Sequence, residues 1–152
     1  MVIFNYYYNS SSHRLRYNLC GYYRKEKVMS TRACYTFKDK ESAFSVYYHY
    51  DGYPSNALQL INKAQKSAWQ FPRFEADEYA AAFCYTAKDG RAGGARLTEG
   101  PHRHGDLSYR YDVWFENNDL MVKIWQVDFD NEKVMDKGSM HAMWSKYVSR
   151  TL

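Results

Sequence analysis

Hydrophobic and polar residues alternate in the first clearly patterned part of the chain. In residues 31–39, Ala33, Tyr35 and Phe37 occupy every second position, and residues 43–51 continue the alternation after a short Lys-Glu-Ser turn. Successive side chains of a β-strand point to opposite faces of a sheet. The two segments therefore predict an antiparallel hairpin with one apolar face.

The period then changes to that of a helix in two consecutive segments. Pro54 leads into the first helix, Ser55 or Asn56 is expected to cap it, and Pro72 is expected to end it. A second helix is predicted over residues 76–87, with acidic residues near its start that suit the helix dipole. Apolar residues spaced by three or four positions give each helix one face to bury: Ala57, Leu60, Ile61, Ala64 and Ala68 in the first, and Ala76, Tyr79, Ala80, Phe83 and Ala87 in the second.

The C-terminal part returns to the strand pattern. Residues 107–116 and 120–129 alternate, and the intervening Asn117–Asn118 is typical of a tight hairpin turn. After another turn, residues 133–137 predict a short strand. Ser139 is then well placed to cap a last helix. This part of the chain is thus expected to form a meander of strands followed by one helix.

The predicted order of elements is ββααβββα, which defines the fold class. Hairpin connections favour a mainly antiparallel sheet, and amphipathic helices cover one face of such a sheet, so the prediction is a two-layer α+β domain. The Gly-rich segment 88–106 interrupts the order. Segments of this length are often functional, and Ala95–Thr98 within it has the pattern of one more short strand.

The composition is that of a folded globular protein. The chain has 152 residues, of which 45% are hydrophobic and 18% aromatic, including 16 Tyr. No apolar run approaches the length of a membrane span, so no membrane partner is expected. The three Cys are an odd number without CxxC spacing, which favours reduced thiols and the bacterial cytoplasm.

Residues 1–28 differ from the rest in composition and charge. They are rich in Tyr, Asn and Ser without a steady period, and we expect a translated leader or a flexible arm, with Met29 as the natural start of a single domain at 29–152. Residues 1–28 hold five of the 21 Lys and Arg and one of the 17 Asp and Glu, which leaves 16 of each in the domain. A neutral domain argues against a nucleic-acid partner, because such binding depends on Lys and Arg that neutralise phosphates.

Aromatic and polar residues concentrate where the second predicted strand ends. His49 and Asp51 are two positions apart, so they are expected to face the same side, where they could perform acid–base chemistry or bind a metal. The structural alternative is that Asp51 stabilises the turn while His49 packs among tyrosines. As a protein-binding surface we predict Tyr48, His49, Tyr50, Asp51, Tyr53 and Arg110.

A second candidate lies in the Gly-rich segment. His102, His104 and Asp106 alternate and could ligate one metal ion if the segment is extended. The spacing is similar to the HxHxDH motif of metallo-β-lactamase-fold hydrolases, but Leu107 stands where that motif has its last His. Solvated histidines are the alternative. A hydrolase or a ligand-binding domain would require these residues to meet His49 and Asp51; otherwise no cofactor is expected.

Three segments resemble a group of small phage, prophage and plasmid proteins. They are residues 30–33, which belong to an MSTRA-like start, the H-x-DGYP element at 49–54, and residues 105–111. The resemblance covers residues 29 to about 125 and implies a mobile-element context more than an activity. Small proteins of this origin often bind a host protein, including components of defence systems.

The resemblance leads to the expectation of a non-enzymatic accessory protein that binds and modulates a host protein. An inhibitor of the anti-CRISPR kind is one form that such a protein takes. A small metal-dependent hydrolase or ligand-binding domain is the first alternative, and a nucleic-acid-binding protein is the second.

Overall fold

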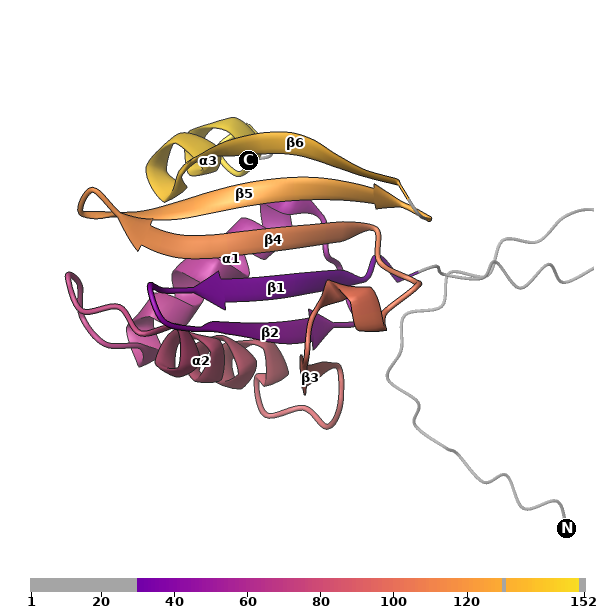
Figure 1. Ribbon diagram of the computed structural model, residues 1–152, viewed down its shortest axis with the longest axis horizontal. Coiled ribbons are helices and arrows are strands. Elements are labelled where there is room, and N and C mark those ends of the chain that lie inside the picture. Colours follow the sequence, from indigo (N-terminus) through magenta and orange to yellow (C-terminus); the bar gives the residue numbers. More distant parts are fainter. Residues whose placement is uncertain (1–29, 130, 151–152) are drawn as a thin grey trace, which may run out of the picture.

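A computed structural model describes residues 30–129 and 131–150 of the chain. Six strands form one sheet in the order β3-β2-β1-β4-β5-β6, and the helices pack on one of its faces, with α1 passing behind the sheet in Figure 1. The elements are β1 (Ala33–Lys38), β2 (Ala43–Tyr48), α1 (Pro54–Ala64), α2 (Ala76–Lys88), β3 (Ala95–Thr98), β4 (Tyr109–Glu116), β5 (Asp119–Asp128), β6 (Asn131–Ser139) and α3 (Met140–Tyr147). The predicted two-layer α+β fold is confirmed.

The sheet is antiparallel except at its centre. The hairpin β1–β2 and the meander β4–β5–β6 are antiparallel, whereas β1 and β4 are parallel, with Tyr35 opposite Tyr111. A parallel pair needs a long crossover connection, and the segment with α1, α2 and β3 supplies it. Strand β3 is the short strand expected within the Gly-rich segment, and it pairs with the outer edge of β2.

Two predicted boundaries of α1 are wrong. The helix begins at Pro54 with Tyr53 as its N-cap, so the expected capping residues lie inside it, and the Tyr53 side chain makes no capping hydrogen bond to the described first turn. Pro suits the first helical position because the N–H it lacks would have no partner there. The helix ends at Ala64, well before Pro72, and continues into the short 3₁₀ helix Gln65–Ser67.

Two turn and cap predictions are confirmed at the other end of the chain. Asn117 and Asn118 both have left-handed φ angles of 52° and 60°, as a tight hairpin turn requires. The Ser139 hydroxyl accepts the Ala142 N–H at 3.2 Å, which caps α3. Strand β6 is longer than predicted, because pairing with β5 extends over Asn131–Ser139.

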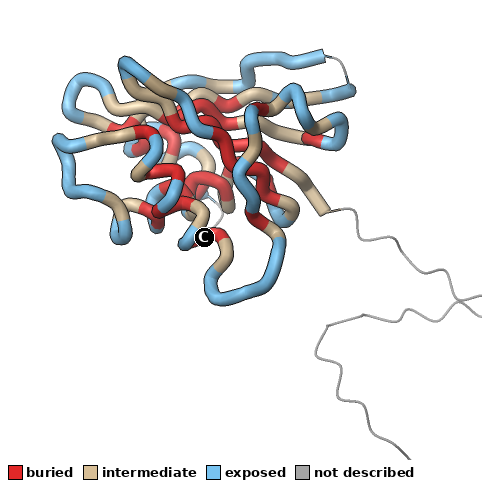
Figure 2. The backbone as a smooth tube through the Cα atoms, turned by 60° about the horizontal axis from the view of Figure 1, so that its bottom comes forward, coloured by how far each residue is buried: buried red, intermediate tan, exposed pale blue. Residues whose placement is uncertain are grey.

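The core is an aromatic layer between the sheet and the helices. Tyr35 stacks on Tyr111, with ring centroids 4.9 Å apart, and also contacts Phe83 of α2 at 4.4 Å. Figure 2 shows the buried backbone concentrated in the central strands and in the helices beneath them. The Tyr111 hydroxyl donates to the Gly52 carbonyl at 2.6 Å. The core thus holds the β2–α1 connection, where the predicted binding residues lie.

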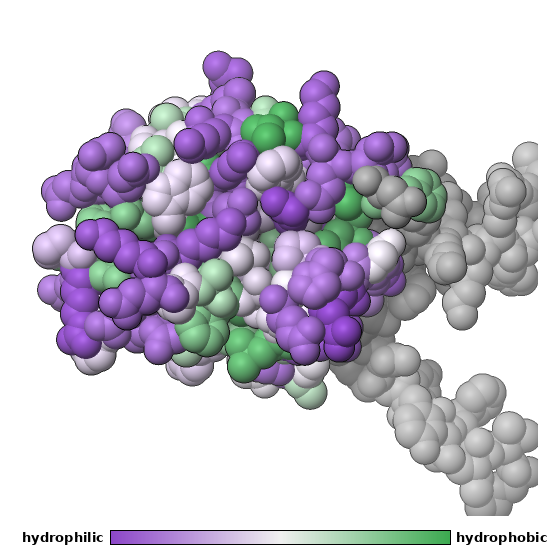
Figure 3. Space-filling view, in the orientation of Figure 1, coloured by the Kyte–Doolittle hydropathy of each residue, from purple (hydrophilic) through white to green (hydrophobic). Residues whose placement is uncertain are grey.

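Among the described residues, no α-helix packs on the other face of the sheet, which we call the open face. The segment before β4 crosses this open face at one end (Figure 1), and Leu107 there packs on Cys34 and Tyr47. Figure 3 views this side and shows mainly hydrophilic residues with small hydrophobic areas between them. No helix in the described ranges is long and apolar enough to cross a membrane.

Candidate binding surface at one end of the sheet

The β2–α1 connection, residues 49–53, forms the rim of the sheet where β1 and β4 begin. Strand β2 ends at Tyr48, and Asp51 takes a left-handed φ of 41°. The Gly52 N–H then donates to the Thr31 carbonyl at 2.8 Å. Because the extended conformation stops before Asp51, the strand parity on which the predicted common facing of His49 and Asp51 depends does not apply here.

The two residues have different neighbours. His49 lies with Tyr47 and Arg32 on the open side. The charge of Asp51 contributes to raising the pKa of Tyr35 and of Tyr111 above the ordinary range, although burial of these tyrosines is the larger cause. The Asp51 carbonyl accepts the Asn56 side-chain amide at 2.7 Å, so Asp51 belongs to the turn into α1. The arrangement does not bring a His–Asp pair together for acid–base chemistry.

Glycines at two positions allow the connection to pack closely. A Cβ on Gly52 would lie 2.7 Å from the Ala33 Cβ, and a Cβ on Gly94 would lie 2.7 Å from Cε2 of Tyr50. Gly94 also has a φ of +80°, which L side chains rarely adopt. Its carbonyl accepts the His49 N–H at 2.8 Å. The loop before β3 is thereby joined to the β2–α1 connection and supports the Tyr50 ring.

Tyr50 and Tyr53 are the exposed part of this surface, which we call the tyrosine rim. Tyr50 is 48% exposed and Tyr53 is 53% exposed. The Tyr50 ring meets His49 edge-on at 5.0 Å, and the Tyr53 ring lies 5.9 Å from that of Tyr109. Both side chains therefore present a large area to solvent while their rings rest against fixed neighbours.

A polar network joins the rim to the open face. The Tyr47 hydroxyl donates to Asp106 Oδ2 at 3.2 Å and lies 3.2 Å from His49 Nδ1. Arg32 Nε is 3.1 Å from the same Asp106 oxygen and 3.4 Å from His49 Nδ1. Burial and the Asp106 charge both raise the pKa of the Tyr47 hydroxyl, which keeps it protonated. Tyr47 and Arg32 thus each contact both Asp106 and His49, and they link the segment before β4 to the β2–α1 connection.

The remaining predicted metal ligands have other partners. His104 stacks on Tyr47 at 4.3 Å, and its Nε2 lies 2.8 Å from the Thr98 hydroxyl. Burial, and secondarily the Arg96 charge, lower the pKa of His104 and favour its neutral form. His102 lies against Gly100. Within the described part of the chain, no three His, Cys, Asp or Glu side chains gather as a metal site would require.

Tyr48 and Arg110 lie outside the tyrosine rim. Tyr48 is buried, because its side chain points to the helices. Arg110 lies on the open face, where its guanidinium stacks over Trp125 at 4.2 Å and pairs with Glu132 of β6. Of the six predicted binding residues, four thus belong to the β2–α1 connection: His49, Tyr50, Asp51 and Tyr53.

Sequence reasoning did not identify Arg32, Tyr47 and Gly94 as parts of this surface. Tyr47 is two positions before His49, so strand parity alone places both on the open face. Arg32 and Gly94 carry no comparable signal, because their roles depend on which segments meet in the fold.

In comparisons with known proteins, the chain matches no family, no curated protein and no solved structure.

Proposed function

We propose that this protein is a non-enzymatic accessory protein of a phage or other mobile element that binds and modulates a host protein in the bacterial cytoplasm. A phage or mobile-element origin suggests that the protein modulates its partner by inhibiting a host defence system. The tyrosine rim is the proposed contact surface. The observation that carries the proposal is that Tyr50 and Tyr53 are about half exposed although neighbouring rings support them.

Such tyrosines suit protein recognition for physical reasons. Tyrosine is enriched among the few residues that dominate binding energies at interfaces. It provides a large contact area with few rotatable bonds, so little conformational entropy is lost on binding. The backbone bond from His49 to Gly94 and the ring contacts of Tyr50 hold the surface in place before a partner arrives, which lowers the cost of binding further.

The chemistry of the neighbouring groups also favours binding over catalysis. Arg32, Tyr47 and Asp106 are engaged with one another and with His49. The Cys34 thiol is buried, and burial raises its pKa to about 12. A thiol with that pKa stays protonated near neutral pH and is a poor nucleophile.

Affinity capture with a matched control tests the proposal. The full chain, its double variant Tyr50→Ala/Tyr53→Ala and the control Tyr85→Ala are each used to capture proteins from nuclease-treated bacterial lysates. Tyr85 is a suitable control because it is 75% exposed on α2. We expect the wild type and the control to retain one host protein at stoichiometric yield, and the double variant to lose it. Failure to capture any protein in several hosts, or equal capture by all three chains, would contradict the proposal.

A further inference from the structure

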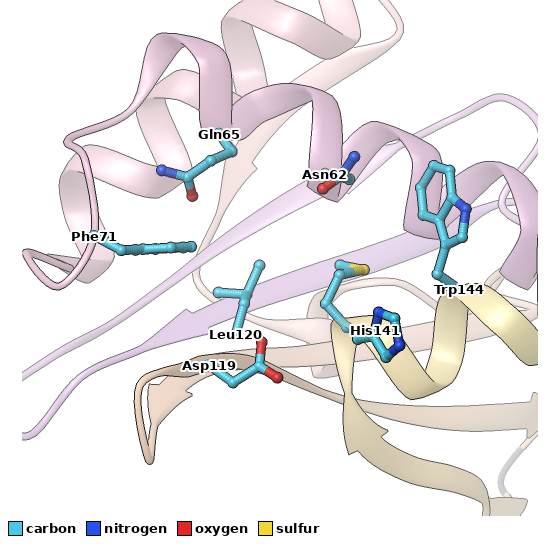
Figure 4. Close-up of a pocket in the computed structure, with 8 residues that line it drawn as sticks. Asn62, Gln65, Phe71, Asp119, Leu120, His141 and Trp144 are labelled. Atoms are coloured by element: carbon cyan, nitrogen blue, oxygen red, sulfur yellow. The ribbon is translucent and has the colours of Figure 1, made fainter.

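A pocket of about 290 Å³ lies at the opposite end of α1 from the tyrosine rim. The last turn of α1, the first turn of α3 and the start of β5 surround it, and Phe71 from the α1–α2 connection closes one side (Figure 4). Its size is near the lower limit of small-molecule sites, which span roughly 300–1,000 Å³. One substituted aromatic ring is the kind of ligand that fits this space.

The walls of the pocket are part apolar and part polar, and two of the apolar residues are aromatic. Leu120 and Met140, both buried, line it together with Phe71 and Trp144. In Figure 4 the rings of Phe71 and Trp144 stand on opposite sides of Leu120. Phe71 also stacks on Phe115 at 4.6 Å, which supports its ring from behind. Two aromatic walls with an aliphatic base favour a flat apolar ligand.

Two of the four polar side chains in the lining, those of Asp119 and Gln65, favour a ligand that donates hydrogen bonds. Asp119 contributes a carboxylate, no Lys or Arg is among the described residues of the lining, and Asn62 and His141 are its other polar members. The Gln65 Nε2 donates to the Trp69 carbonyl at 2.9 Å, which fixes the amide orientation. The opposite atom, Oε1, is buried and has no hydrogen-bond partner among the described residues. A buried acceptor without a partner is destabilising, so a donor that reaches it gains affinity.

We propose that this pocket binds a small planar aromatic cation with N–H donors, such as an amidine, a guanidine or a protonated aromatic amine. The ring of the ligand lies between Phe71 and Trp144, and its cationic group pairs with the Asp119 carboxylate. A further donor reaches Gln65 Oε1 after a small shift of the side chains that cover it. The site is separate from the tyrosine rim, so it does not depend on the proposed partner.

Benzamidine and benzoate are a suitable pair of probes for the full-length protein. Both have one ring and a planar substituent, but benzamidine is a cationic donor and benzoate an anionic acceptor. Each is titrated while the indole N–H signals of the tryptophans are followed by NMR. Trp114 and Trp125 serve as internal references, because their indoles bind carboxylates on the open face of the sheet, away from the pocket. We expect benzamidine to shift the Trp144 signal with a millimolar dissociation constant, and benzoate to leave it in place.

Two isosteric variants test the role of the carboxylate. Asp119→Asn should weaken benzamidine binding about tenfold, as expected from the loss of one charge-assisted hydrogen bond. Asp128→Asn, at the far end of the same strand, should leave the affinity unchanged. No shift of the Trp144 signal, an equal response to benzoate, or full affinity in Asp119→Asn would each overturn the proposal.

Discussion

The ring of Tyr50 lies directly against the backbone of Gly94, so that a Cβ on Gly94 would stand 2.7 Å from Cε2 of the ring. The loop before β3 thus determines where the Tyr50 side chain lies. Gly94→Ala should displace the ring and weaken capture of the host partner, because the rim loses its preorganised shape. The measurement is capture yield, together with the NMR contacts of the Tyr50 ring.

Gly93→Ala is the matched control for this prediction. Gly93 has a φ of +71°, similar to the +80° of Gly94, but a Cβ there would meet no atom of the described residues within 4 Å. Both variants should lose about 1–2 kcal/mol of stability from left-handed backbone strain, whereas only Gly94→Ala should affect the ring. Equal partner capture by both variants would show that the position of Tyr50 does not matter for binding.

Asp39 connects the β1–β2 turn to the start of α2. Its Oδ2 accepts the Ala76 N–H at 2.8 Å, and its Oδ1 accepts the N–H groups of Glu41 and Ser42. These bonds, the one from Ala76 first, lower the pKa of Asp39 from 3.8 to about 2. The folded pKa is below the unfolded one, so the stabilisation is complete above about pH 4 and is lost as the pH falls towards 2.

Substitution of Asp39 should therefore reduce stability most at neutral pH. Asp39→Ala should lower the free energy of unfolding by about 1 kcal/mol at pH 7, the typical effect of removing a helix-capping carboxylate. At pH 2.5 the difference from the wild type should be smaller, and urea unfolding at both pH values measures it. Asp128→Ala at the end of β5 is the control, because Asp128 is exposed and lies away from any helix start. A pH-independent loss in Asp39→Ala would refute the linkage.

The elements that depend on local pattern were predictable from the sequence, and those that depend on tertiary contacts were not. Alternation identified β1, β2 and β4, and the cap at Ser139 follows from its side chain alone. The parallel pairing of β1 with β4 has no local signal, because it joins segments far apart in the chain.

The same division applies to the candidate site. The aromatic cluster at 49–53 was visible from composition, but the parity argument for Asp51 failed where the backbone turns at a positive φ. Arg32 and Asp106 meet because β1 and β4 start side by side, and the chain enters β4 through residue 106. Sequence spacing between residues so distant cannot predict such a pair.

The two thiols in the described part of the chain should differ in reactivity. Cys34 is buried beneath Leu107 and Tyr47, and its pKa is raised to about 12, whereas Cys84 is only partly buried on α2. In a Cys20→Ser background, a thiol reagent at pH 8 should modify Cys84 in the native protein and Cys34 only after unfolding. Mass spectrometry of the labelled peptides identifies the site. Labelling of native Cys34 at the rate of Cys84 would mean that the segment over it opens readily.

The central claim is that the tyrosine rim contacts a host protein, and site-specific photo-crosslinking tests it most directly. A photoreactive phenylalanine derivative replaces Tyr50 in one chain and Tyr85 in the control, and both chains are irradiated in bacterial cells. The account predicts a covalent adduct with one host protein from position 50 and none from position 85. An adduct from position 85 alone, or no adduct from either position in a susceptible host, would contradict it.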